Sequence, residues 1–195
     1  MRTISTNRDN GFTLLELLFT LAIGGIILAM AVPSFKTFAM NNRLTTQNHA
    51  LVASLTLARS EAIKRGQRVV VCKSSDGASC STANTINWEN GWIVFVDSDN
   101  DSTIDSGETL RVSETLEGGN TLRSDSNYSN SVTYLASGLS TQAGTLVLCD
   151  DRNSDGDTAD SADFSSGLAV IVNTTGRART TTASGSGFTN CVTAS

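Results

Sequence analysis

The sequence predicts an α+β fold, in which one long N-terminal helix packs on a mostly antiparallel β-sheet. Apolar residues form a continuous run over 12–32 and then recur at helical spacing, and after residue 66 their period changes to two. A period of two is typical of strands, and a helix followed by a series of strands is typical of an α+β domain. We expect a leader over 1–11, a membrane-length helix over 12–33, an amphipathic continuation over 34–66 and a β-rich head over 67–195.

The first element is a helix long enough to cross a bilayer. The run over 12–32 holds 21 residues, and Glu16 is its only charge. At about 1.5 Å per residue the run spans roughly 31 Å, close to the ~30 Å thickness of the hydrocarbon core. A polar segment with Arg2, Arg8 and Asp9 as its charges precedes it. A carboxylate in such a helix is costly unless it finds a positive partner, so Glu16 needs an explanation.

The hexapeptide at 11–16, Gly-Phe-Thr-Leu-Leu-Glu, resembles the processing site of type IV pilins and type II secretion pseudopilins. The resemblance implies that a prepilin peptidase cuts after Gly11 and methylates the new amine of Phe12. It also implies that Glu16 pairs with the N-terminal amine of a neighbouring subunit, so that two costly ions become one pair in a filament core. The chain would lie in the bacterial inner membrane with its head in the periplasm, and later in a periplasmic or cell-surface filament.

An ordinary secretory signal peptide is the alternative interpretation of this N-terminus. The two arginines before the apolar run would form its positive segment, and Ala-Met-Ala at 29–31 offers a cleavage site. The run is long for a signal peptide and Glu16 interrupts it, so the pilin interpretation is favoured. The two interpretations differ in the mature N-terminus, which is N-methylated Phe12 in a pilin and Val32 in a secreted protein.

The second half of the helix carries an apolar stripe on one face. The stripe has spacings of 7, 4, 3 and 4 residues, and its members are Leu44, Leu51, Leu55, Ala58 and Ala62. Lys64 and Arg65 suit a last helical turn, which ends at about residue 65. We expect the helix to be loosened at 24–25, a Gly-Gly pair, and at Pro33, and its second half to lie across the sheet of the head.

Seven strands are expected after the helix. The two strongest are Arg-Val-Val-Val-Cys at 68–72 and Trp-Ile-Val-Phe-Val at 92–96, which are rich in β-branched and aromatic residues. With one proline and 16 glycines in the chain, turns must rely on glycine, asparagine, aspartate and serine. Weaker strands are expected at 109–113, 131–135, 145–149, 167–172 and 177–182.

Four cysteines in an exported chain are expected to form two disulfides. Four cysteines allow three pairings. The favoured pairing joins Cys72 to Cys80 across a short hairpin-like loop, and Cys149 to Cys191, which would hold the polar C-terminal segment against a central strand. A redox pair is the alternative, but the chain lacks a Cys-x-x-Cys motif.

The segment at 97–108 is the first candidate ligand site. It resembles a twelve-residue calcium loop, but Ser102 replaces the turn glycine and a strand, not a helix, precedes it. A solvated acidic hairpin loop is the alternative and is favoured. A second acidic loop at 151–157 matches only the first half of the pattern. Calcium is thus the only candidate cofactor, and its ligands would be Asp97, Asp99, Asp101, Asp105 and Glu108.

The sequence offers no catalytic constellation, and we do not expect an enzyme. The paired acids lie in loop clusters with no base or nucleophile nearby. His49 is the only histidine, and a lone histidine on a helix flank is ordinarily a surface or packing residue. A zinc set could be assembled only from the cysteines expected to form disulfides.

The segment Gly176-Arg177-Ala178-Arg179 is the second candidate site. Residues two apart in a strand point to the same face, so Arg177 and Arg179 would project side by side among threonines. Two guanidiniums beside hydroxyls and backbone amides suit successive phosphates. The alternative is a solvated pair that protects an edge strand from unwanted pairing.

The charge of the chain is unevenly distributed. The net charge is −5, yet residues 36–73 hold seven Lys and Arg against one acid, whereas residues 97–163 hold 14 Asp and Glu against three arginines. An acidic total therefore does not exclude an anionic partner at one end of the head.

Three segments of the head resemble the GspH/FimT family: 88–97, the acidic turn that ends at Glu108, and 176–179. The stretch 114–165 carries no matched motif. In FimT-type minor pilins a Gly-Arg-x-Arg near the C-terminus is implicated in DNA binding during natural transformation. The resemblance carries that role to Arg177 and Arg179, in the motif that Gly176 opens. Candidates to extend this basic patch are Lys64, Arg65, Arg68 and Lys73.

Two functions are therefore weighed. The first is a FimT-like minor pilin, which joins a type IV pilus and binds the DNA backbone. The second is a GspH-like minor pseudopilin of a type II secretion system, with protein partners and no nucleic-acid role. The arginine pair favours the first. A soluble calcium-binding secreted protein is a third hypothesis, and it requires cleavage after Ala31.

Overall fold

The structure is a computed structural model that describes residues 12–152, 161–188 and 190–191. The leader with Gly11, and Asp155 and Asp157 of the second acidic loop, lie outside the described residues. The chain divides into two compact units, Met1–Ala39 and Met40–Ser195. Helix α1 contributes its first part to one unit and its second part to the other, and each unit is considered separately below.

Helix α1 runs over Leu14–Arg65 and contains 52 residues. Thr13 caps it, because its side-chain oxygen accepts a hydrogen bond from the backbone N–H of Glu16 at 3.2 Å. The helix is unbroken at 24–25 and at residue 33, where we expected loosening. A glycine or a proline carries only a local cost, and continuous hydrogen bonding on both sides maintains so long a helix.

The first part of α1 is long and apolar enough to cross a membrane, and α1 is the one helix of the described residues that passes this test. Its large apolar side chains are exposed in the isolated chain, with exposed fractions between 55% for Leu17 and 76% for Leu14. Exposed apolar surface of this extent is stable only in lipid or against other apolar helices.

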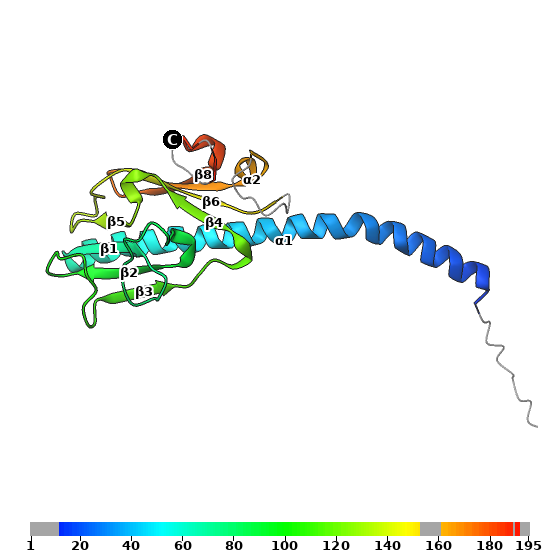
Figure 1. Cartoon of the computed structure of the whole chain (residues 1–195), viewed down its shortest axis with the longest axis horizontal. Helices are drawn as coiled ribbons and strands as arrows, with labels where there is room; N and C mark the ends of the chain where they lie inside the picture. Colours follow the sequence, from blue (N-terminus) through cyan, green and yellow to red (C-terminus); the bar gives the residue numbers. More distant parts are fainter. Residues whose placement is uncertain (1–11, 153–160, 189, 192–195) are drawn as a thin grey trace, which may run out of the picture. The chain divides into compact units, whose positions relative to one another are not determined.

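In the described part of the chain, eight strands form two antiparallel sheets of four strands each (Figure 1). The first sheet has the order β3-β2-β1-β5, with β1 at Arg68–Lys73, β2 at Trp92–Asp97, β3 at Thr109–Ser113 and β5 at Ser131–Tyr134. The second has the order β4-β6-β7-β8, with β4 at Thr121–Ser124, β6 at Gly144–Cys149, β7 at Leu168–Val172 and β8 at Ala178–Thr182.

All seven expected strands are present, but two details of the prediction were wrong. One sheet was expected, but the strands of the head divide between two sheets. Strand β4 and the short helix α2 (Ser161–Ser166) were not predicted. Both lie in the stretch without a matched motif, and both are too short for a period to be recognised.

The core of the head lies between the second half of α1 and the inner faces of both sheets. The predicted stripe of α1 is buried, and it packs with Val69 and Val71 of the first sheet and with Leu146 and Leu148 of the second. Successive strand residues point to opposite faces, so Val70 of β1 lies on the outer face of the first sheet. There it packs with other residues beneath the acidic loop and the first disulfide: Cys72, Ile93, Phe95, Cys80 and Ile104.

Both disulfides of the favoured pairing are formed. Cys72 and Cys80 have Cα atoms 5.5 Å apart, and Cys149 and Cys191 have Cα atoms 6.0 Å apart. The second disulfide belongs to a small cluster on the outer face of the second sheet, which also contains Phe188 and Ala183. The C-terminal segment therefore covers that face.

Candidate nucleic-acid interface

Arg179 lies in β8, the edge strand of the second sheet, and Arg177 directly precedes this strand. Arg179 pairs with Ile171 in the ladder, and the carbonyl of Arg177 accepts a hydrogen bond from the Asn173 N–H at 3.3 Å. The ladder thus extends back to Arg177. Ala178 between the arginines is half-buried against the core, whereas both arginines are exposed. Both arginine side chains are therefore open to solvent at this edge of the sheet.

A tight turn sets the position of Arg177. Gly176 donates its N–H to the carbonyl of Asn173 at 2.8 Å, and the Asn173 side chain accepts the Arg177 N–H at 3.1 Å. Gly176 has φ +76°, and a Cβ there would overlap the carbonyl oxygen of Gly138. The glycine of the motif is thus required by a left-handed backbone and by a close approach of two turns.

The Gly176→Ala variant is expected to destabilise the head by about 3 kcal/mol, because it adds left-handed strain and a backbone clash. Urea unfolding of the full chain in detergent, followed by the fluorescence of Trp88 and Trp92, measures this loss. Gly107→Ala is the matched control, since Gly107 has φ +87° with open space around its would-be Cβ. The control should lose only about 1 kcal/mol from strain. Equal losses in the two variants would contradict the clash with Gly138.

The four residues expected to extend the patch do not add free charge to it. Lys64 and Arg65 both pair with Glu61, at 3.3 Å and 2.6 Å, and the hydrogen bond from Arg65 holds the pKa of Glu61 below its usual value. Arg68 pairs with Asp97 at 3.1 Å. Lys73 is buried and donates to the carbonyl of Ala83 at 3.2 Å, and burial lowers its pKa.

The residue that sequence reasoning missed is Arg59, on α1. Its Nε donates to the carbonyl of Gly138 at 3.0 Å, and it lines a cavity together with Arg177. Arg59, Arg177 and Arg179 form no salt bridge with any acid in the described part of the chain. In the sequence, Arg59 could be noticed only as an arginine next to the apolar stripe of α1. Its position in the sequence does not reveal which strand it approaches.

The acidic loop at 97–108 is closed by its own hydrogen bonds. Glu108 accepts from the N–H and hydroxyl of Ser98 with one oxygen, and from the N–H of Asp105 with the other, and these bonds lower its pKa. The charge of Glu108 in turn raises the pKa of Asp105. The glutamate that would bind calcium through both oxygens is therefore already engaged within the loop.

Three of the five acids of this loop do come together. One carboxylate oxygen from each of Asp97, Asp99 and Asp101 lies within 4.8 Å of the others. However, Asp97 is buried and forms a salt bridge with the guanidinium of Arg68. The positive charge of Arg68 repels a cation that would bind to Asp97. Arg68 thus competes with a cation for Asp97, and we propose no metal site here.

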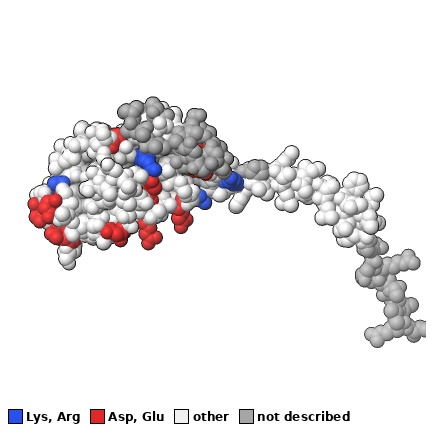
Figure 2. All heavy atoms as spheres, in the orientation of Figure 1, with Lys and Arg blue, Asp and Glu red and all other residues white. Residues whose placement is uncertain are grey.

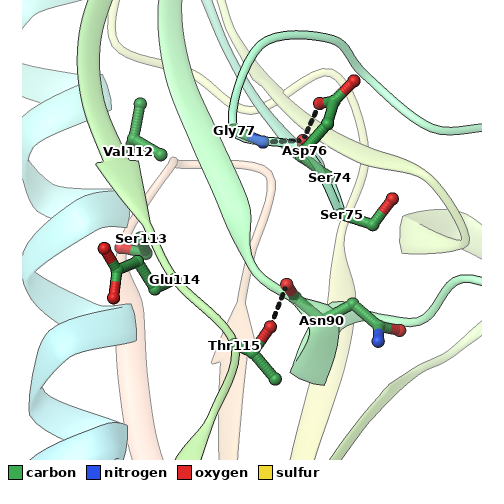
Figure 3. A pocket seen from close by; sticks show the side chains of 9 residues that line it. All are labelled: Ser74, Ser75, Asp76, Gly77, Asn90, Val112, Ser113, Glu114 and Thr115. Atoms are coloured by element: carbon green, nitrogen blue, oxygen red, sulfur yellow. Dashed lines mark hydrogen bonds between the residues drawn. The ribbon is translucent and has the colours of Figure 1, made fainter.

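A cavity of about 530 Å³ lies between the turn at 74–77 and the end of β3 (Figure 3). Ser74 donates its hydroxyl to Asp76 at 2.9 Å and accepts the Gly77 N–H at 3.1 Å. Asp76 also accepts the N–H groups of the next turn residues, and these hydrogen bonds hold its pKa far below the usual value. The polar groups of this cavity thus stabilise their own turn, and its lining holds two acids and no cationic side chain.

The fold and the N-terminus together define a pilin-like protein: an apolar, membrane-length helix continues into a disulfide-bonded β head. Residues 6–32 match the family model of the prokaryotic N-terminal methylation motif, and residues 47–187 match that of the type II transport protein GspH. The second match spans well over half of the sequence. The chain belongs to the GspH family, and it is a minor pilin or pseudopilin of the GspH/FimT kind.

Individual relatives agree with this class. The pilin-like protein PilA1 of Thermus thermophilus is 35% identical over 100 residues, which are 50% of this chain and 54% of that protein. The match thus spans about half the length of this curated relative. The minor pilin FimU of Pseudomonas aeruginosa superposes with a TM-score of 0.55 at 19% identity, over 75% of this chain and 94% of FimU. A second crystal form of FimU gives a TM-score of 0.51 at 20% identity, over 72% and 94%. At this identity the likeness to FimU shows the fold alone.

Proposed function

We propose that this chain is built into a type IV pilus as a minor pilin and that its head binds the DNA backbone during DNA uptake. The observation that supports the proposal is the pair Arg177 and Arg179. Both are exposed, neither has an acidic partner among the described residues, and a turn centred on Asn173 and Gly176 fixes their backbone. Lys64, Arg65 and Arg68 are paired with acids, whereas this pair of arginines is free of acids and close together, so it offers a place for an anionic partner.

The expected ligand is a phosphate backbone, which carries no base information. Guanidiniums donate bidentate hydrogen bonds to phosphate oxygens, and the threonines of β8 supply hydroxyls beside them. Two phosphates neutralised per subunit give a log–log salt slope of about −2. Affinity per head is therefore weak, and several heads in one filament would bind together with much higher avidity.

Assembly into the filament is proposed to depend on the N-terminal segment. A prepilin peptidase would cut after Gly11 and methylate Phe12, and the apolar helix would hold the chain in the inner membrane with its head in the periplasm. Glu16 lies in the first turn of α1, next to the cap at Thr13. There its carboxylate would pair with the N-terminal amine of the next subunit. In this pair the two charges neutralise each other, so that neither is isolated in lipid.

The second candidate function is a minor pseudopilin of a type II secretion system. The matching family model describes a type II transport protein, and this description favours it. Figure 2 shows acidic side chains along the lower rim of the head, over β2 and β3 as drawn in Figure 1, and such a surface suits a protein partner better than DNA.

DNA binding separates the two candidates. The Arg177→Ala/Arg179→Ala variant of the full chain in detergent is expected to bind a fluorescent duplex at least about tenfold more weakly at low salt, with the salt slope near zero. Arg43→Ala/Arg111→Ala is the matched control, because it removes the same charge from two head arginines without a salt bridge in the described structure. Fluorescence anisotropy over a salt series measures both. Equal binding by the two variants, or no binding by the unmodified chain, would leave the secretion role.

A further inference from the structure

A small cavity lies directly beside the arginine pair, between α1 and the turn before β8. It has a volume of about 190 Å³ and a lining that contains two arginines and no acid. A water molecule occupies about 30 Å³ of liquid, so the cavity can hold a phosphate group in place of several waters. The lining residues are Leu55, Thr56, Arg59, Gly176, Arg177 and Ala178.

Arg59 is held in place before any ligand arrives. Its half-buried side chain donates from Nε to the carbonyl of Gly138 at 3.0 Å. The same carbonyl is the atom that a side chain at Gly176 would overlap, so the β5–β6 connection and the turn before β8 meet next to α1. The backbone supports this junction, because Ser140 donates its N–H to the carbonyl of Thr174 at 3.1 Å.

This fixation leaves the outer part of the guanidinium available. Only Nε of Arg59 is engaged in a hydrogen bond within the described residues, so both Nη atoms can still donate. A guanidinium already fixed by one hydrogen bond loses little conformational entropy when it binds a ligand. Thr56 lies three residues earlier on the same helix and is exposed, so its hydroxyl can donate to the same ligand.

We propose that Arg59, Thr56 and Arg177 form a phosphate-binding cleft that seats one phosphate of the DNA backbone. Arg179, two residues along β8, then meets the neighbouring phosphate of the same strand. This inference rests on the proposed DNA binding and makes it more specific. The interface would span α1 and β8, and each head would contact two successive phosphates with three guanidiniums.

The test compares three single variants of the full chain in detergent with the unmodified chain. Arg59→Gln keeps a hydrogen-bond donor and removes the charge, whereas Arg59→Lys keeps the charge. Arg111→Ala is the matched control for net charge. It lies on β3, at the opposite edge of the first sheet from β5, and it does not line the cleft.

Anisotropy titrations with a fluorescent duplex are expected to show about threefold to tenfold weaker binding by Arg59→Gln. The salt slope should stay near about −2, because Arg177 and Arg179 still contact two phosphates. Arg59→Lys should retain most of the affinity, and Arg111→Ala should bind like the unmodified chain. If Arg59→Gln also binds like the unmodified chain while the Arg177→Ala/Arg179→Ala variant is weakened, the cleft proposal is overturned and the DNA function stands.

A second measurement distinguishes failure of the cleft from failure of DNA binding. If the unmodified chain binds no duplex, the proposed function is wrong, and inorganic phosphate then tests the cleft directly. Amide NMR signals of Thr56 and Arg177 that shift with phosphate in the unmodified chain, but not in Arg59→Gln, would support the cleft. Unchanged signals in both chains would overturn it. Thermal unfolding of each variant verifies that Arg59→Gln and Arg59→Lys are folded.

Discussion

The Trp92→Ala variant is expected to lose about 4 kcal/mol of unfolding free energy, because a large side chain is removed from a closed core. Trp92 lies on β2, is 1% exposed and packs in the main core cluster. Its indole N–H donates to the hydroxyl of Ser54 on α1 at 3.0 Å. The side chain thus joins the first sheet to the helix.

Urea unfolding of the full chain in detergent, followed by Trp88 fluorescence, measures this effect, since Trp88 is present in every variant. Trp92→Phe separates packing from hydrogen bonding, because the ring keeps most of the volume and loses the N–H. We expect this control to lose only about 1–2 kcal/mol. A similar small loss in Trp92→Ala would show that Trp92 is not a central contact between sheet and helix.

Removal of the Cys149–Cys191 disulfide is expected to cost about 4 kcal/mol in the Cys149→Ala/Cys191→Ala variant. The two cysteines are 42 residues apart, and the cross-link removes loop-closure entropy from the unfolded chain. Alanine is used because a serine hydroxyl would be buried at both positions. The same urea titration measures the loss.

The Cys72→Ala/Cys80→Ala variant is the matched comparison. These cysteines are only eight residues apart, so the same entropy argument gives a loss of about 2.5 kcal/mol. The larger loss should therefore accompany the longer loop. A larger loss at Cys72 and Cys80 would show that packing on the outer face of the first sheet, and not chain entropy, controls the stability from the disulfides.

The helix and the strands could be predicted because each carries its own period. The stripe from Leu44 to Ala62 repeats at helical spacing, and the run at 68–72 is β-branched, so local pattern and final structure agree. Strand β4 has only four residues, and only Leu122 among them is fully buried. A single buried residue has no period, so β4 could be recognised only from its pairing with β6.

The division into two sheets was not predictable from residue patterns. Strand pairing joins segments far apart in the sequence, such as β1 with β5. It depends on which strand edges are still unpaired once the strands have packed on α1. The same limit applies to the candidate site. Arg177 and Arg179 were found because two residues of one strand share a face, a local rule that one sequence can supply.

The sequence alone was enough to recognise the apolar N-terminal helix, the N-terminal motif at 11–16, the strand periods and the arginine pair. Each of these patterns involves residues that are close together in the sequence. Which charges are free depended on the folded chain. Lys64, Arg65 and Arg68 looked available in the sequence and are paired with Glu61 and Asp97. Arg59 attracted no attention there and lies in a cleft with Arg177. Ion pairing and cavities depend on distances through space, and these exist only once helix and sheets have packed.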